Sequence, residues 1–406
     1  MTLEEARALD AADPLAFARK RFRLPEGVIY LDGNSLGALP AATPGRLAEV
    51  AEHQWGEELI ASWNKHGWID LPTRVAAKLA EIVGAAPDEV IIADSTSVCL
   101  FKALGAAARA RPGRRTILTE ESNFPTDLYV AQGVAELLGL ELKINGTARL
   151  PEALAEDTAV LFLTHVDYRS GAKHDLAGLT AAAHHAGALT VWDLSHSAGA
   201  VELNLDAARA DLAVGCGYKY LNGGPGAPAF LYARRDLQDQ LRSPLPGWMG
   251  HAEPFAFERA HRPASGMAQF LTGTPSILAL AALEAGLDTF SGVSIAEVEG
   301  KARALTSLFV DEVETRCPEL TLTSPRDPAS RGAHVSFAHP EAYAIVQALI
   351  AHGVIGDFRA PDLLRFGFAP LTTRYEDAWR AAAMMAEVLD SGAYQQPRFQ
   401  TRARVT

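Results

Sequence analysis

The chain has 406 residues, enough for two ordinary domains with a large buried core. Apolar residues make up 48% of it and charged residues 21%, a globular composition that argues against wholesale disorder. With 37 basic and 49 acidic groups the net charge is −12, and there is no long Lys/Arg run. This charge argues against binding to nucleic acid or to an anionic membrane.

No stretch approaches the roughly 20 consecutive apolar residues that a membrane-spanning helix needs. The N-terminus, MTLEEARALDAADP, is acidic and lacks the basic-then-apolar order of a signal peptide. The three scattered cysteines, Cys99, Cys216 and Cys317, exclude a disulfide framework and fit a reducing cytosol. The sequence therefore predicts a cytoplasmic location.

The first 30 residues predict a helix that leads into a short apolar stretch, VIYLD, and then into the loop DGNSLG at 32–37. Residues 44–63 have roughly helical spacing. From about 88 to 235, short apolar runs alternate with helical segments. The predicted strands are 90–94, 116–120, 160–164, 190–194, 212–216 and 229–233, and the predicted helices are 95–110, 126–138 and 176–187. This alternation predicts a mostly parallel sheet with helices on both faces.

After about residue 290 the pattern changes. It predicts helices at about 294–315, 340–352 and 374–390, with the apolar runs LTLTS, VIGDF and LLRFGF between them. The fold class is therefore α/β, with a large domain and a smaller α+β domain at the C-terminal end. We expect an N-terminal segment at 1–50 that packs with the small domain, a large ligand-binding domain at 51–290 and the small domain at 291–406.

Open α/β sheets bind ligands at the carboxyl ends of their strands, so the residues just after each predicted strand are candidates. Ser95, Thr96 and Ser97 follow the first strand at a helix N-terminus, which suits a phosphate group, although a plain helix cap is an equally ordinary interpretation. Further polar residues follow the later strands and would meet at the same edge: Ser122 to Asp127, Asp193, His196, Tyr218 and Lys219.

An acid that ends a buried strand is unfavourable unless it is paired. Asp193 could cap a helix, or it could neutralise a buried cationic heterocycle. Lys219 lies in a Gly/Tyr loop beyond a core strand and is one of only 8 lysines in the chain. A buried lysine of this kind can act as a nucleophile that forms a Schiff base.

A helix-capped phosphate, a strand-end Asp and a strand-end Lys are the three features that a pyridoxal phosphate enzyme needs. The phosphate anchors the cofactor, the Asp keeps the pyridine nitrogen protonated, and the Lys holds the aldehyde and moves protons. The competing motifs are weak. The loop GCGYKY has Tyr220 where a dinucleotide loop has its last glycine, and the histidines show no recognised metal spacing, so no metal is expected.

Four motifs together resemble the kynureninase family of fold-type I, aspartate-aminotransferase-like pyridoxal phosphate enzymes: DGNSLG (32–37), NFPTD (123–127), DLSHSAGA (193–200) and GYKYLNGGPGAPAF (217–230). The resemblance runs from about residue 28 to 370. The order and spacing of DLSHSAG and GYKYLNGGPG are its most specific part.

The resemblance implies roles for individual residues. Lys219 would bind the cofactor aldehyde, Asp193 would pair with the pyridinium, and Tyr218 would be a further catalytic group. The other implied cofactor contacts are Thr96, Ser97, Phe124, Asp127, Thr164, His196, Trp248 and Thr274. Trp248 and Thr274 resemble residues that such dimers lend to the neighbouring subunit, and other family members have Asn at the position of Thr274. Arg365 would hold the substrate α-carboxylate, with Ser35 and Trp63 also at the substrate.

The activity that the resemblance implies is hydrolysis of L-kynurenine, or of 3-hydroxykynurenine, to anthranilate, or 3-hydroxyanthranilate, and L-alanine. This reaction belongs to tryptophan catabolism or NAD biosynthesis. The implied assembly is a homodimer. Another possibility is a cysteine desulfurase or selenocysteine lyase of the same fold, which would need a mobile cysteine; Cys317, beside Pro318, lacks a clear activating neighbour. A regulator that binds the cofactor without catalysis is disfavoured by the acidic charge.

Overall fold

A seven-stranded sheet forms the centre of the larger part of the computed structural model, which describes residues 1–402. All six strands predicted at 88–235 are present, together with β6, an edge strand that the polar sequence ELKIN concealed. Across the sheet the strands are β4 (Val90–Ala93), β10 (Ala229–Ala233), β9 (Leu212–Cys216), β8 (Leu189–Asp193), β7 (Thr158–Thr164), β5 (Thr116–Glu120) and β6 (Glu141–Asn145).

Six of these strands run in one direction, and only β10 is antiparallel to its neighbours β4 and β9. The chain passes from β9 to β10 through the glycine-rich loop 217–228, without a helix. Parallel neighbours need a long crossover connection, so β10 returns in the opposite direction. The strands that carry the predicted site residues therefore end at the same edge of the sheet.

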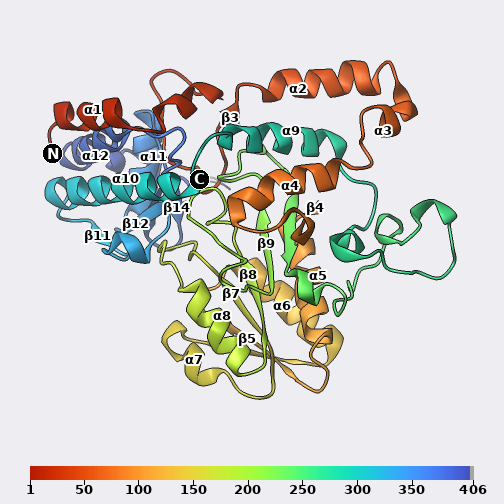
Figure 1. Ribbon diagram of the computed structural model, residues 1–406. Coiled ribbons are helices and arrows are strands. Elements are labelled where there is room, and N and C mark those ends of the chain that lie inside the picture. The colour runs from red at the N-terminus through yellow and green to blue at the C-terminus, as the bar shows by residue number, and fades with distance from the viewer. Residues whose placement is uncertain (403–406) are drawn as a thin grey trace.

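Helices cover both faces of this sheet, as predicted (Figure 1). On one face lie α4 (Leu71–Val83), α8 (Leu176–His185) and α9 (Ile277–Leu287), and on the other lie α5 (Thr96–Arg109) and α6 (Pro125–Leu138). In β4, for example, Ile92 belongs to the first apolar cluster and Ile91 to the second. Strands that are buried on both faces have continuous apolar sequences, and for this reason the core strands could be predicted from the sequence.

A second sheet lies in the C-terminal part of the chain, as expected for an α+β domain. Its antiparallel order is β11 (Thr321–Leu322), β12 (His334–Ala338), β15 (Leu363–Gly367) and β14 (Asp357–Arg359), and it packs with α10 (Ile295–Arg316), α11 (Ala342–Ala351), α12 (Tyr375–Asp390) and α13 (Pro397–Gln400). The sequence interpretation missed β12. Its apolar residues, Val335 and Phe337, alternate with polar His334 and Ser336, so one face joins the core and the other faces the large domain.

The N-terminal residues divide between the two parts of the molecule. Helix α1 (Leu3–Ala12) lies along α12, where Asp10 accepts hydrogen bonds from the N–H groups of Tyr375 and Glu376 (Figure 1). The short strand β2 (Ile29–Tyr30) pairs with β13 (Val354–Ile355) of the small domain. Helix α2 (Thr43–Glu49) instead packs on α9 of the large domain. The domain boundaries at 50 and 290 stay a prediction, and residues 403–406 of the predicted third segment lie outside the described chain.

Several short elements complete the described N-terminal part. Strands β1 (Phe22–Arg23) and β3 (Leu39–Pro40) pair with each other, and a helical arm continues α2 through a π-helical turn, Val50–Trp55, into α3 (Ser62–Lys65). A further short helix, α7 (Leu150–Ala153), precedes β7. Within residues 1–402, no single helix is long and apolar enough to cross a membrane; the bent pair Ile277–Phe290 with Ile295–Arg316 passes that test only when its two members are taken together.

Candidate active site

The carboxyl ends of the parallel strands bring together the polar residues that the sequence singled out. Asp127 follows β5, Thr164 ends β7, Asp193 ends β8 and Lys219 follows β9. Hydrogen bonds and electrostatic interactions connect all four side chains to one another or to His196, as the next paragraphs describe. The expectation that these strand ends meet at one edge is confirmed by the topology.

Lys219 lies in a tightly held loop. The N–H of Gly37 donates to the Tyr218 carbonyl, and a Cβ at Gly37 would lie 2.3 Å from the Lys219 carbonyl oxygen, so only glycine allows the N-terminal loop to close over this segment. The side-chain nitrogen Nζ of Lys219 lies 3.0 Å from Nε2 of His196. Among the described residues no carboxylate forms an ion pair with Lys219, so its amine is available for chemistry.

His196 is a buried neighbour of this amine. Burial, and then the positive charge of Lys219, hold the pKa of His196 well below its usual range, so the imidazole is neutral. Because a neutral ring has one accepting nitrogen, Lys219 donates to Nε2 and we assign the imidazole proton to Nδ1. Within the described residues Nδ1 is buried without a hydrogen-bond partner.

Asp127 and Asp193 are two buried carboxylates close to each other. The hydroxyl of Thr164 donates to Asp127 Oδ2 at 3.1 Å, and the N–H of Ser195 donates to Asp193 Oδ1 at 2.6 Å. Burial, and then the charge of Asp193, raise the pKa of Asp127 well above its usual range, while Lys219 lowers it slightly. The close approach of the two carboxyl groups is therefore relieved by a proton on Asp127 or by a cationic group beside the pair.

This donor set fits the pyridoxal phosphate that the motifs imply. A protonated pyridine nitrogen would be the cation that the paired carboxylates favour. The amine of Lys219 is within the same site and forms no ion pair. The Thr164 hydroxyl, expected at the cofactor, lies within hydrogen-bond distance of both Asp127 and Asn123 and shares its one hydrogen between them.

The start of α5 offers the expected anion site. Thr96 begins the helix, Ser95 makes no side-chain capping bond, and the hydroxyl-bearing residues Ser95, Thr96 and Ser97 are all at least partly exposed. The first N–H groups of a helix have no partner within it and carry a partial positive charge. They can therefore hold a phosphate.

Phe124 is half exposed at the start of α6. Its ring contacts the ring of Tyr168 edge-on, with centroids 5.1 Å apart and planes at 84°. The other face of the phenyl group is free to cover a flat heterocycle. The Tyr168 carbonyl in turn accepts a hydrogen bond from Arg365, so this contact joins the two halves of the site.

Arg365 is fully buried on β15 and holds four of its N–H groups in protein contacts. It donates from Nε to Asp357 Oδ1 at 2.8 Å and from Nη2 to Asp357 Oδ2 and to the Ser35 hydroxyl, the last at 3.0 Å. Tyr168 takes one Nη1 hydrogen, and the other has no partner among the described residues. The guanidinium is thus oriented, with one donor left for a ligand.

The sequence interpretation missed two charged residues beside Arg365. Asp357 lies directly opposite Arg365 in the antiparallel register of β14 and β15, and Arg359 donates to the same carboxylate at 2.6 Å. Burial, and then the charge of Asp357, raise the pKa of Asp32 in the same cluster to about 7. A signal was present in the sequence, since an acid within the apolar run VIGDF requires a buried cation.

A third missed neighbour is His334 on β12. Its ring packs against His196, with centroids 5.1 Å apart, and burial lowers its pKa to about 3. His334 and Ser336 lie on the same face of the small sheet as Arg365, because side chains alternate along a strand. The small domain therefore contacts both the Lys219 side and the Arg365 side of the site.

Three predicted site residues do not join this cluster within one chain. Trp63 packs edge-on against Trp68 at 6.0 Å, in an apolar cluster with Val50 and Ala281. Trp248 is exposed and contacts Phe255. Thr274 is exposed and lines a hollow of about 330 Å³ with Asp94 and Ser95, next to the start of α5.

The three cysteines are buried and unpaired. Burial raises the pKa of the Cys99 and Cys317 thiols to about 12 and also raises that of Cys216. None therefore has the exposed thiolate that a nucleophilic cysteine needs. Among the described residues, no group of three or more His, Cys, Asp or Glu side chains is placed to hold a metal ion.

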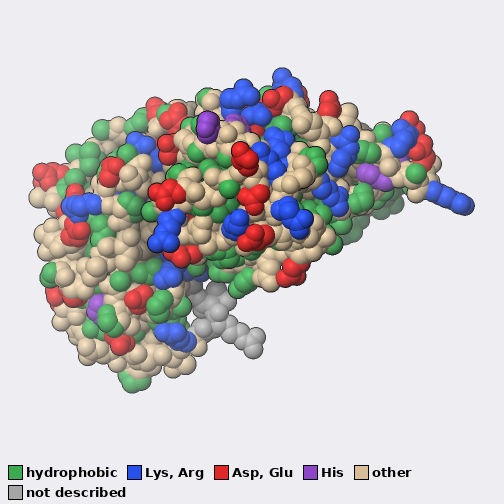
Figure 2. Space-filling view, turned by 90° about the horizontal axis from the view of Figure 1, so that it is seen from below, with side chains coloured by type: hydrophobic (Ala, Val, Ile, Leu, Met, Phe, Trp, Pro, Cys, Tyr) green, Lys and Arg blue, Asp and Glu red, His purple; other side chains and the backbone are tan. Residues whose placement is uncertain are grey.

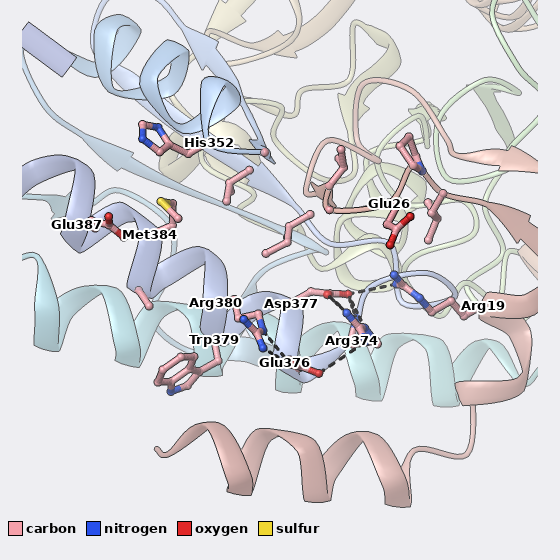
Figure 3. A pocket seen from close by; sticks show the side chains of 18 of the residues that line it. Arg19, Glu26, His352, Arg374, Glu376, Asp377, Trp379, Arg380, Met384 and Glu387 are labelled. Atoms are coloured by element: carbon pink, nitrogen blue, oxygen red, sulfur yellow. Dashed lines mark hydrogen bonds and ion pairs between the residues drawn. The ribbon is translucent and has the colours of Figure 1, made fainter. Parts of the chain in front are cut away.

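Other surface features differ in character from this site. A groove of about 830 Å³ lies between the N-terminal segment and α12 (Figure 3), and its described lining residues include none of the predicted site residues. Its arginines are already paired: Arg19 and Arg374 with Asp377, and Arg380 with Glu376. On the face seen in Figure 2, acidic and basic side chains are interspersed rather than gathered into one basic patch.

Comparison with known proteins identifies sequence relatives. A family model described as the kynureninase C-terminal domain matches residues 298–385. The chain is 50% identical over 414 aligned residues to the kynureninase of Pseudomonas fluorescens, and equally to that of Burkholderia mallei strain SAVP1; each alignment covers 100% of both chains.

Solved structures share the fold at much lower identity. The cysteine desulfurase of Thermococcus onnurineus NA1 is 19% identical with a TM-score of 0.78, covering 93% of this chain and 98% of that one. A mutant of C-DES, with glycine covalently linked to its PLP cofactor, is 20% identical with a TM-score of 0.79, covering 91% and 99%. The α/β fold predicted from the sequence, that of fold-type I enzymes, is confirmed.

Proposed function

Because the chain belongs to the kynureninase family, we propose that it catalyses the hydrolytic cleavage of the Cβ–Cγ bond of L-kynurenine, giving anthranilate and L-alanine. It is an enzyme that acts on kynurenine, with pyridoxal phosphate as its cofactor. The observation that carries the proposal is the amine of Lys219, which forms no ion pair with a described residue. It lies beside neutral His196 and within the field of the buried pair Asp127 and Asp193.

The bound cofactor supplies a ring that accepts electrons and so stabilises a carbanion at the substrate carbon next to the amino group. We propose that Lys219 would hold the cofactor through its aldehyde and that its amine would take the proton from Cα of the substrate. The 3.0 Å contact between Lys219 Nζ and His196 Nε2 holds the lysine amine in position. A neutral imidazole suits this task, because an imidazolium there would repel the lysine cation.

Asp193, supported by Asp127, would keep a proton on the ring nitrogen. Thr164 orients Asp127 through its hydroxyl, and the Ser195 N–H orients Asp193, so both carboxylates are fixed before a ligand enters. His196 and Phe124 would bound the ring. Thr96 and Ser97 would bind the phosphate through their hydroxyls, and Tyr218 would contact the cofactor beside Lys219.

Arg365 would bind the substrate α-carboxylate through its remaining Nη1 hydrogen, with the Ser35 hydroxyl beside it. Its other contacts prevent rotation of the guanidinium, so that the scissile bond is held in one orientation. Burial raises the pKa of the Tyr218 phenol, so Tyr218 stays protonated and would donate to the substrate γ-carbonyl oxygen as water adds.

We further propose a homodimer in which Trp248, Thr274 and Trp63 complete the partner's site. Large apolar side chains are exposed near these residues, including Phe257 at 78% and Ile60 at 80% of their surface. Exposed clusters of this kind mark association surfaces. The buried, protonated thiols do not favour a desulfurase or selenocysteine lyase reaction. The unpaired cysteines support a cytoplasmic location.

The reaction itself is tested with Lys219→Ala. Wild-type protein loaded with pyridoxal phosphate should release anthranilate, followed by its fluorescence, from L-kynurenine. The variant should lose about 10³-fold or more in kcat, because both the covalent attachment and the proton transfer are removed. Lys143→Ala, on the exposed strand β6, is the matched control and should keep full activity. A wild-type protein that releases no anthranilate would refute the proposed function.

Arg365→Lys tests the carboxylate site while leaving Asp357 a cation partner. We expect KM for L-kynurenine to rise about tenfold or more, with a smaller fall in kcat, because lysine cannot reproduce the planar fork. Arg331→Lys is the control, since Arg331 is equally buried but bonds to Thr306 and Ser307. If KM is the same in both variants and in wild type, Arg365 does not bind the substrate.

Ionisation of the Asp32 carboxyl is expected to make KM for L-kynurenine depend on pH. With a pKa of about 7, its carboxyl is protonated at pH 6 and ionised at pH 8, where it adds a negative charge beside Arg365. KM should therefore rise roughly fivefold between these pH values, the effect of about 1 kcal/mol. Asp32→Asn should remove the rise, whereas Asp157→Asn, on the surface, should keep it. A persistent rise in Asp32→Asn would assign the titration to another group.

The dimer is tested by sedimentation velocity. Wild-type protein should sediment at twice the mass of one chain, and Phe257→Asp should shift it toward the monomer because a charge is placed in the apolar patch. The shifted variant should also lose activity as the partner's residues leave the site. Leu137→Asp, an exposed residue of α6, should stay dimeric. A monomeric wild-type protein with full activity would contradict the shared site.

A further inference from the structure

Lys102 is a fully buried lysine that the proposed mechanism does not use. It lies two turns inside α5, within the apolar cluster on one face of the large sheet, and its exposed fraction is 0%. Its Nζ donates to Asp94 Oδ2 and, at 2.5 Å, to the carbonyl oxygen of Phe270. A buried ammonium group is unfavourable without such partners, so both contacts are needed to keep it there.

Asp94 lies in the turn that joins β4 to α5, directly before Ser95 and Thr96. Its φ is +44°, a left-handed conformation that residues other than glycine rarely adopt. Two further bonds hold this turn: Ala229 N–H donates to the Asp94 carbonyl, and the Cys99 thiol donates to the Ala93 carbonyl. The ion pair with Lys102 holds the Asp94 side chain while its backbone is in this strained region.

Phe270 ends the turn Gly266–Phe270 and precedes the segment that carries Thr274. Thr274, Asp94 and Ser95 line the same hollow of about 330 Å³. One ammonium group therefore contacts Asp94, which lines the hollow, and Phe270, which directly precedes the lining segment that carries Thr274.

We propose that Lys102 is a positioning residue for the cofactor phosphate. By binding Asp94 and the Phe270 carbonyl, it holds the turn at 94–97 so that the first N–H groups of α5 and the hydroxyls of Thr96 and Ser97 converge on one point. The inference rests on the proposed function, which places the phosphate at the start of α5. Lys102 itself is buried behind the turn and acts through it.

Lys301 provides a matched comparison. It is also a buried lysine that donates to one carboxylate, Asp13 at 2.7 Å, and to one carbonyl, Pro370 at 2.6 Å. Its partners belong to the N-terminal segment and the small domain, away from α5. Loss of either lysine should destabilise the protein, but only loss of Lys102 should alter the phosphate site.

The experiment measures equilibrium binding of two probes to the apoprotein: pyridoxal phosphate, and pyridoxal, which lacks the phosphate. For Lys102→Met we expect the ratio of the pyridoxal Kd to the pyridoxal phosphate Kd to fall about tenfold, the size of an ordinary coupling between contacting groups. The Kd for pyridoxal should stay within about twofold of wild type. Lys301→Met should keep the wild-type ratio.

Asp94→Ala tests the same pair from its partly exposed side, in case Lys102→Met does not fold. It should lower the ratio to a similar extent, and the double variant should lower it no further than either single variant, because both disrupt one contact. An unchanged ratio in Asp94→Ala, or an equal fall in Lys301→Met, would overturn the inference. A wild-type protein that binds both probes equally would instead overturn the phosphate site that the proposed function assigns.

Discussion

Two carboxylates buried side by side set the main constraint on this molecule. Asp127 and Asp193 share a dry site at the ends of two parallel strands, where burial, and then the charge of Asp193, raise the pKa of Asp127. Such a pair is relieved by a proton on Asp127 or by a cation close by, and Lys219, which also contacts His196, lowers the pKa of Asp127 only slightly. The hydrogen bonds from Thr164 and Ser195 hold both carboxyl groups in place, where they would contact the pyridine ring of the cofactor. The parallel sheet topology produces this geometry, because only parallel strands bring so many carboxyl ends to one edge.

The second half of the site depends on three separate segments. Arg365 comes from the small sheet, Ser35 from the N-terminal loop, and the Tyr168 carbonyl from the large domain. Ser35 and Tyr168 each contribute one contact to the guanidinium of Arg365, so any relative movement of the segments changes the position of that group. The same Tyr168 packs on Phe124, which is why the two halves form one site rather than two neighbouring ones. In the proposed reaction, Tyr168 would therefore connect Arg365, which would bind the substrate carboxylate, with Phe124, which would contact the cofactor ring.

Three buried basic side chains of this protein each form an ion pair with a carboxylate. Arg365 lies against Asp357 on the neighbouring strand, Lys301 lies against Asp13 of the N-terminal segment, and Lys102 lies against Asp94 in the turn before its own helix. A buried pair adds little net stability, but it specifies one arrangement because a shifted register would leave a charge unpaired. Two of the chain's 8 lysines, Lys102 and Lys301, form buried pairs of this kind.

The sequence alone predicted six of the seven strands of the large sheet and several of the polar residues that meet at its edge. Core strands buried on both faces appear as apolar runs, and Asp193 and Lys219 stand out because charged residues rarely follow such runs. Helix N-termini and glycine-rich loops are equally local, so Thr96, Ser97 and the 217–228 loop could be recognised too. The tertiary structure decided which charges meet. Asp357 faces Arg365 through strand register, His334 reaches His196 through domain packing, and Lys102 is buried through the position of the Phe270 carbonyl. His334 and Lys102 meet partners far away in the chain, so no local pattern encodes these two contacts. Asp357 and Arg365 are only 8 residues apart, but their contact depends on the register of two strands.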